Sequence, residues 1–249
     1  MLLGHFRDLF VALNLIWGSS SQMTVIVHSS DPVTLVGGAD IRLSDLTIAL
    51  TFAPGLVAAD GGADHLLQAG LQPQAVIGDL DSITDAARFA FDHVLHHVPE
   101  QQTTDFDKAL RHIAAPLVIA LGVTGGRFDH ELAALHVLLS HPDRLCLLLG
   151  PDNLTMLCPP ALSLDLTPGT VVSLFPLGPV RCGSTGLRWA TDGLDFAPDR
   201  LIGTSNEATG PVTLTPDAPA MLLILPADAL AETVRALLAA PAQWPARAE

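Results

Sequence analysis

The chain has little of several residue types, and each shortage argues against a class of protein. It has no tyrosine, only 5% aromatic residues, and three cysteines (Cys146, Cys158 and Cys182) that lack CxxC spacing. Three widely spaced cysteines argue against a disulfide framework or a zinc site and fit a reducing cytoplasm, which is the location we expect. No apolar run reaches the roughly 18 residues of a spanning helix, so we expect no membrane partner.

Basic residues are also scarce. The chain carries 12 Lys and Arg against 26 Asp and Glu, a formal net charge of -14. Such a surface repels a phosphodiester backbone, so we expect no nucleic acid partner. The 49% hydrophobic share and mean hydropathy of +0.42 argue against disorder, and 249 residues suffice for one large domain or two small ones.

The first 22 residues need separate treatment. Leu9–Trp17 is an apolar stretch that resembles the core of a signal peptide, but Asn14 interrupts it and no clear cleavage pattern follows. We expect residues 1–22 to be a dispensable N-terminal extension, with Met1 and Met23 as alternative starts.

Hydrophobic periodicity divides the remainder of the chain. Over residues 23–150 apolar strand-like runs alternate with helical segments, which predicts a mostly parallel sheet with helices on both faces. Over residues 151–249 the period changes to two, with Pro and Gly turns and a final helix after Asp228, which predicts an antiparallel β-sandwich domain. The predicted fold class is therefore α/β followed by a sandwich.

The central motif is Val76–Ser82, in which a buried strand runs into Gly78 and then into Asp79 and Asp81. Two carboxylates this close repel each other unless a cation lies between them or one is protonated. A hard ion with oxygen ligands, most simply Mg²⁺, explains the pair. The alternative is a polar turn with a helix cap.

A second acidic motif opens a predicted helix capped by Thr104. Asp105 and Lys108 are three residues apart and are expected on its outward face, while Phe106 and Leu110 face the core. The carboxylate can join a metal site while the ammonium contacts phosphate oxygens. The alternative is an acidic residue favoured by the helix dipole and a surface ion pair.

Two glycine-rich loops follow predicted strands, Asp60–Gly62 and Gly125–Arg127. Glycine lets backbone N–H groups approach a phosphate, and arginine can bind phosphate oxygens with two parallel hydrogen bonds. Asp129 is the expected N-cap of the next helix, which begins beside His130. A tight turn requires glycine for the same steric reason and remains the alternative.

One tryptophan, Trp189, lies outside the terminal segments. In a strand-rich region it is either a core anchor or a face on which a flat, cationic heterocycle stacks.

Six motifs in one order resemble the thiamine pyrophosphokinase family. They are Asp60–Ala63, Gly78–Ser82, Thr104–Ala109, Gly125–His130, Thr185–Trp189 and Thr204–Asn206. The resemblance implies a homodimer with active sites between subunits. The implied reaction moves the pyrophosphoryl group of ATP to the hydroxyl of thiamine, giving thiamine diphosphate and AMP.

The resemblance also implies roles for individual residues. It assigns magnesium binding and catalysis to Asp79, Asp81 and Asp105. It assigns the nucleotide side to Asp60, Gly61, Lys108, Gly125, Gly126, Arg127, Asp129 and His130. It assigns thiamine binding to Gln101, Trp189, Ser205 and Asn206. The alternatives are a pyrophosphokinase for another heterocyclic alcohol, such as a pterin, and a non-catalytic nucleotide-binding regulator.

Overall fold

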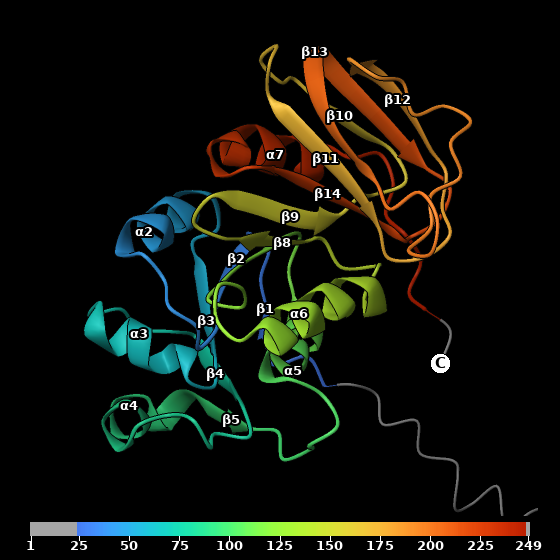
Figure 1. The fold of residues 1–249 in the computed structure, drawn as a ribbon. Coiled ribbons are helices and arrows are strands. Elements are labelled where there is room, and N and C mark those ends of the chain that lie inside the picture. Colours follow the sequence, from blue (N-terminus) through green and yellow to red (C-terminus); the bar gives the residue numbers. More distant parts are fainter. Residues whose placement is uncertain (1–23, 248–249) are drawn as a thin grey trace, which may run out of the picture.

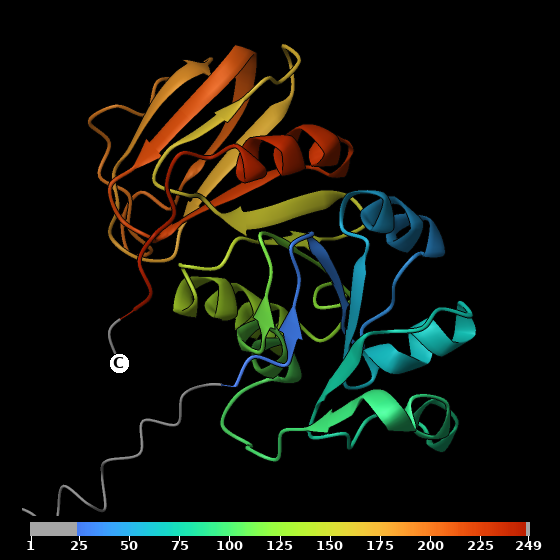
Figure 2. The same cartoon turned by 180° about the vertical axis from the view of Figure 1, so that it is seen from behind.

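The computed structural model describes residues 24–247, so the predicted extension over residues 1–22 lies outside the described residues. Figures 1 and 2 show an α/β part at one end and a β-rich part at the other, with the last helix packed beside the strands of the β-rich part. No helix between residues 24 and 247 is both long and apolar enough to cross a bilayer.

The α/β part alternates short strands with helices. Its strands are β1 (Val27–His28), β2 (Val33–Val36), β3 (Gly55–Ala59), β4 (Ala75–Gly78), β5 (Leu95–His97), β6 (Ile113–Ala114), β7 (Val118–Leu121) and β8 (Cys146–Leu149). Its helices are α2 (Leu43–Phe52), α3 (Gly62–Gln68), α4 (Asp85–Ala90), the 3₁₀ turn η1 (Asp92–Val94), α5 (Asp105–Arg111) and α6 (Phe128–Ser140).

The β-rich part follows directly. Its strands are β9 (Asn153–Leu157), β10 (Leu162–Leu164), β11 (Val171–Pro176), β12 (Cys182–Leu187), β13 (Thr204–Pro216) and β14 (Met221–Pro226). The 3₁₀ turn η2 (Ala227–Ala229) leads into α7 (Leu230–Leu238).

Every strand pairing within residues 24–150 is parallel, as predicted, but the main sheet continues beyond them into antiparallel strands, so it is mixed and not mostly parallel as a whole. This nine-stranded sheet of the described chain runs β10-β13-β11-β14-β9-β8-β7-β2, with β12 paired to β13. Only β2, β7 and β8 pair in parallel; from β8 onward every pairing is antiparallel. The cause is the short turn after β8, closed by Gly150 N donating to Asn153 O at 2.9 Å, since a turn this short joins antiparallel strands.

The α/β part does place helices on both faces of parallel strands, as predicted. β3, β4 and β5 pair in parallel, and β3 and β4 are buried along their whole length. Because successive side chains point to opposite faces, alternate residues of these strands enter two different cores. One core includes residues of α5 and α6, and the other includes residues of α2, α3 and α4.

This arrangement brings the carboxyl ends of β3 and β4 to one edge. Ala59 is paired with Ile77, so Asp60, which follows β3, and Gly78, the last residue of β4, emerge side by side. Open α/β sheets place ligands at this kind of edge.

Gly62, at the start of α3, allows that helix to approach β2 closely. A Cβ at position 62 would overlap the carbonyl oxygen of Val36, which belongs to the backbone of a buried strand and cannot move aside. Gly38 differs, because a Cβ there would meet nothing closer than 3.8 Å.

We therefore expect Gly62→Ala to lower the free energy of unfolding by about 1–3 kcal/mol, the usual cost of overpacking a core. Gly38→Ala is the control and should stay within about 0.5 kcal/mol of wild type. Urea denaturation followed by circular dichroism measures both. Equal stability of the two variants would show that α3 is not held against β2 as described.

Candidate active site

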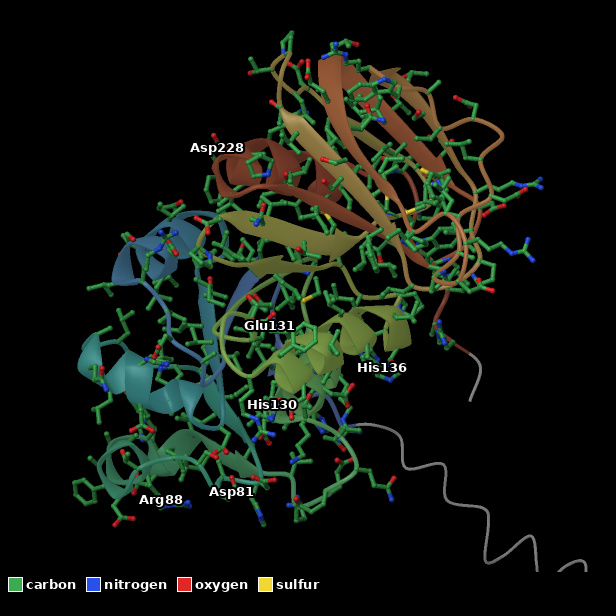
Figure 3. The ribbon with its side chains drawn as sticks, viewed as in Figure 1. Asp81, Arg88, His130, Glu131, His136 and Asp228 are labelled. Atoms are coloured by element: carbon green, nitrogen blue, oxygen red, sulfur yellow. The ribbon has the colours of Figure 1, made fainter. Side chains whose placement is uncertain are left out.

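Four aspartates gather where β3, β4 and α5 meet. Asp60 follows β3, Asp79 and Asp81 follow β4, and Asp105 is the first residue of α5. One carboxylate oxygen from each of Asp60, Asp79 and Asp81 lies within 4.8 Å of the other two. Asp105 joins them because its Oδ1 accepts a hydrogen bond from Asp79 N at 3.2 Å. Figure 3 labels Asp81 in this loop, next to Arg88 of α4.

Lys108 lies inside this cluster, and the prediction that it faces outward is wrong. Its side chain is 1% exposed, and its Nζ donates to Asp79 Oδ2 at 2.9 Å and to Asp105 Oδ1 at 3.0 Å. Burial alone would lower the pKa of Lys108, but the two carboxylates outweigh burial and raise it. The hydrogen bond from Lys108 in turn lowers the pKa of Asp79. Lys108 is therefore a fixed positive charge between two aspartates.

Asp60 is the most deeply buried of the four, at 2% exposed. Its Oδ2 accepts a hydrogen bond from Ser82 N at 3.1 Å, whereas its Oδ1 is buried and finds no hydrogen-bond partner in the part of the chain that the structure describes. Burial raises the pKa of Asp60 to about 6; the bond from Ser82 opposes the rise, and the charges of Asp105, Asp79 and Asp81 add to it. A buried carboxylate oxygen without a partner is unfavourable.

These residues fit a bound divalent cation. Hard cations such as Mg²⁺ take oxygen ligands, and the cluster offers carboxylate oxygens from separate loops. A cation would give Asp60 Oδ1 a partner and reduce the repulsion among the carboxylates. The sequence analysis does not predict that Asp60 joins the carboxylate cluster, and it assigns no role to Ser82. Besides its backbone bond to Asp60, Ser82 donates a hydrogen bond from its Oγ to Asp81 Oδ1 at 2.8 Å. Both placements follow from the parallel pairing of β3 with β4, which the sequence pattern does not reveal.

The backbone is strained in the loops that follow β4 and β3. Leu80 has φ 63°, a left-handed value that is unfavourable for a bulky residue, and Asp60 has φ 41°. The Arg88 guanidinium donates a hydrogen bond to the Leu80 carbonyl oxygen and holds this conformation. At Gly78 a Cβ would lie 2.9 Å from Asp105 Oδ1, so a glycine here lets α5 approach β4. Strain of this kind concentrates at ligand sites.

Gln101 also reaches the cluster. Its Nε2 donates to Asp79 Oδ2 at 3.0 Å, the same oxygen that accepts from Lys108. The loop before α5 therefore helps orient Asp79 in this chain. Thr104 caps α5 as predicted, because its Oγ1 accepts from Asp107 N at 3.2 Å.

The second glycine-rich loop lies at the start of α6, where Figure 3 labels His130 and Glu131. Gly125 N donates to Glu131 Oε1 at 2.7 Å, and Arg127 pairs with Asp129 at 2.6 Å. Asp129 is not the N-cap: α6 begins at Phe128, and its N-cap residue, Arg127, makes no capping bond with its side chain. Arg127, Asp129 and His130 are exposed, and no hydrogen bond among residues 24–247 links them to the aspartate cluster.

In the β-rich part, Trp189 lies on the surface, two residues after the end of β12. The residue is 55% exposed, so it is not a core anchor. The buried Asn206 fixes its backbone: Asn206 Oδ1 accepts from Trp189 N at 3.1 Å, and Asn206 Nδ2 donates to Trp189 O at 2.7 Å. The Arg188 guanidinium lies over the indole, 4.9 Å from the ring centroid. Ser205, next to Asn206, is paired with Ser173 of β11.

The structure does not bring this second group of residues to the aspartates. Asp81 lies in the loop after β4, in the α/β part (Figure 3), whereas β12 and β13 lie in the β-rich part (Figures 1 and 2), and among residues 24–247 no side-chain hydrogen bond or ion pair joins the aspartates to Trp189, Ser205 or Asn206. Within one chain, the aspartate cluster and the Trp189 region are therefore separate.

Comparisons with known proteins agree with this division. A family profile described as "Thiamin pyrophosphokinase, catalytic domain" matches residues 47–147, and one described as "Thiamin pyrophosphokinase, vitamin B1 binding domain" matches residues 161–221. The first match contains all four aspartates and Lys108, and the second contains Trp189, Ser205 and Asn206.

Individual relatives extend the match over both parts. Thiamine pyrophosphokinase 1 of Arabidopsis thaliana is 30% identical over 183 residues, covering 59% of this chain and 68% of the relative. Thiamine pyrophosphokinase 2 of the same plant is 29% identical over 232 residues, 75% of this chain and 87% of the relative. The thiamin pyrophosphokinase structure from Candida albicans shares the fold, with a TM-score of 0.67 at 15% identity over 84% of this chain and 95% of that one. The chain belongs to the thiamine pyrophosphokinase family.

Proposed function

We propose that the chain transfers the pyrophosphoryl group of ATP to the hydroxyl of thiamine, giving thiamine diphosphate and AMP. The observation that carries this function is the gathering of four aspartates and a buried lysine within the segment that matches the family's catalytic domain. The match of residues 161–221 to a vitamin B1 binding domain supports thiamine rather than a pterin as the acceptor. A carboxylate cluster that contains the buried Asp60, with strained backbone at Asp60 and Leu80, argues against a regulator that only binds nucleotide.

We propose that Asp79, Asp81 and Asp105 hold Mg²⁺, with Asp60 contributing its unpartnered Oδ1. When bound, the ion neutralises charge on the triphosphate of ATP and favours attack at the β-phosphorus. The thiamine hydroxyl oxygen bonds to that phosphorus, the bond to the oxygen that leaves with AMP breaks, and a carboxylate of the cluster takes the hydroxyl proton.

In this proposal, Lys108 and the two glycine-rich loops, Asp60–Gly62 and Gly125–Arg127, bind the nucleotide. The ammonium of Lys108 keeps Asp79 and Asp105 in position and adds positive charge next to the phosphates. Gly61, Gly125 and Gly126 allow backbone N–H groups to approach the nucleotide. Arg127, Asp129 and His130 are exposed at the start of α6 and available to it.

Trp189 provides the aromatic surface on which thiamine stacks in this proposal. The thiazolium ring carries a positive charge, and a cation is attracted to the face of an indole. Asn206 fixes the backbone of Trp189 and so orients the ring, and Ser205 adds a nearby hydroxyl. Gln101 is proposed to contact thiamine from the aspartate side.

A complete site then requires two chains. Because the aspartates and Trp189 lie in separate parts of one chain, we propose a homodimer in which the nucleotide-binding domain of one subunit (residues 23–150) faces the thiamine-binding β-sandwich domain of the other (residues 151–249). A cytoplasmic location is also proposed; the three cysteines are buried and unpaired, which suits a reducing compartment.

The direct test of the function is incubation of the purified chain with MgATP and thiamine. We expect AMP and thiamine diphosphate in equal amounts. Asp81→Asn should reduce the rate at least about a hundredfold with the fold intact, because a cluster carboxylate is lost. Asp31→Asn, in an exposed turn before β2, is the control and should keep full activity. Thiamine-independent AMP release, or an unchanged rate in Asp81→Asn, would contradict the proposal.

A second prediction concerns stability and the role of Asp60. Its pKa is raised from 3.8 to about 6 on folding, so without a cation the folded chain loses stability as pH rises through this window, and the loss persists above it. At pH 8 with EDTA, Asp60→Asn should therefore melt about 5 °C above wild type.

Adding Mg²⁺ should raise the Tm of wild type and raise that of Asp60→Asn much less, because the variant has lost a ligand. Asp31→Asn serves as control here too and should follow wild type in both buffers. If Asp60→Asn gained as much from Mg²⁺ as wild type, Asp60 would not be a ligand.

A third prediction tests the two-chain site. Trp189→Ala should raise the KM for thiamine roughly tenfold through lost stacking. A heterodimer of one Asp81→Asn chain and one Trp189→Ala chain contains one site with both residues intact. At low thiamine it should show about half the wild-type rate, whereas each homodimeric variant is far slower. If the heterodimer stays as slow as its parents, each site is built within one chain.

A further inference from the structure

A polar network with a buried centre lies on the far side of α5 from the aspartate cluster. Its centre is Asp107, which is 7% exposed. Asp107 Oδ1 bonds to His141 Nε2 at 2.6 Å, and Asp107 Oδ2 lies 3.8 Å from Arg111 Nε. In a helix, residues two positions apart point in nearly opposite directions, so Asp107 points away from Asp105.

The network extends into the loop before α5. Arg111 pairs with Glu100 Oε2 at 3.1 Å. Glu100 Oε1 accepts from Thr103 N at 2.9 Å and from Thr103 Oγ1 at 2.7 Å. This loop carries Gln101, which bonds to Asp79 in the aspartate cluster.

The network therefore holds two elements that carry residues of the site. Through Asp107 it fixes the first turn of α5, which bears Asp105 and Lys108. Through Arg111 and Glu100 it fixes the loop that bears Gln101. His141 attaches both to the carboxyl end of α6, whose other end carries the second glycine-rich loop.

Stability alone does not account for this arrangement. Burying charged groups costs free energy, and a buried ion pair often adds no more stability than apolar side chains of similar size. Such a pair does fix geometry, because its hydrogen bonds form in only one arrangement. Burial raises the pKa of Asp107, but the bond from His141 and the charges of His141 and Arg111 outweigh burial and lower it, so Asp107 stays ionised.

We propose that Asp107 and His141 are positioning residues that set the placement of Asp105, Lys108 and Gln101 without touching substrate. This inference rests on the proposed function, because it assigns a role in the same reaction. A displacement of about 1 Å in a catalytic group can reduce a rate about a hundredfold.

The test compares His141→Ala with His141→Gln. We expect His141→Ala to lower kcat about tenfold with the KM for thiamine within about twofold of wild type, because Trp189 is untouched. His141→Gln retains an N–H donor for Asp107 and should recover most of the rate. Asp107→Asn, which removes the charge, should behave like His141→Ala.

Two controls separate positioning from general damage. His136→Ala removes an exposed histidine about one turn earlier on α6 (Figure 3), which bonds to Ser140, and should leave kcat unchanged. Val137→Ala opens a cavity in the core that α5 and α6 share, and it should lower Tm while kcat at 25 °C stays unchanged. A kcat for His141→Ala equal to that of the controls would overturn the proposal.

Hydrogen exchange gives a readout that does not depend on the reaction. Amides of residues 100–111 should exchange faster in His141→Ala than in wild type, and those of β7 should not change. If wild type makes no thiamine diphosphate but this exchange difference appears, the proposed function fails while the network still holds the loop. Unchanged exchange over residues 100–111 would overturn the positioning role itself.

Discussion

The contact on which the aspartate cluster depends is the buried ammonium of Lys108. It lies between a carboxylate from the loop after β4 and one from α5, and it is the only cation bonded to the four aspartates in residues 24–247. The contact requires α5 to lie close against β4, which Gly78 permits. Without Lys108, negative charges from two elements would face each other across a short gap.

Much of the site could be predicted from sequence because the signals are local. The buried strand that ends in Gly78 and Asp79, and the Thr104 cap, each depend on a few adjacent residues. The direction of the Lys108 side chain depends instead on where α5 packs. Helix periodicity describes one helix, whereas a long lysine stem reaches the nearest carboxylates once the helix is in place.

Features that depend on strand pairing could not be predicted in this way. The alternation of apolar residues identifies strands but does not say which strands share hydrogen bonds. The sequence therefore predicts a mostly parallel sheet followed by a separate antiparallel sandwich, whereas the pairing of β8 with β9 joins both parts in one mixed sheet. The membership of Asp60 in the cluster was missed for the same reason, because it follows from the register of β3 with β4. The start of α6 differs by only a residue or two, a common uncertainty at helix ends.

The continuous sheet has a mechanical consequence. Backbone hydrogen bonds run without a break from β2 to β10, across the junction at which one part of the chain gives way to the other. A hinge motion between the two parts would break the backbone hydrogen bonds between β8 and β9. Domain closure about such a hinge would therefore cost much free energy. Adjustment to incoming substrates is instead expected from the loops around the strand ends, which lie outside this ladder.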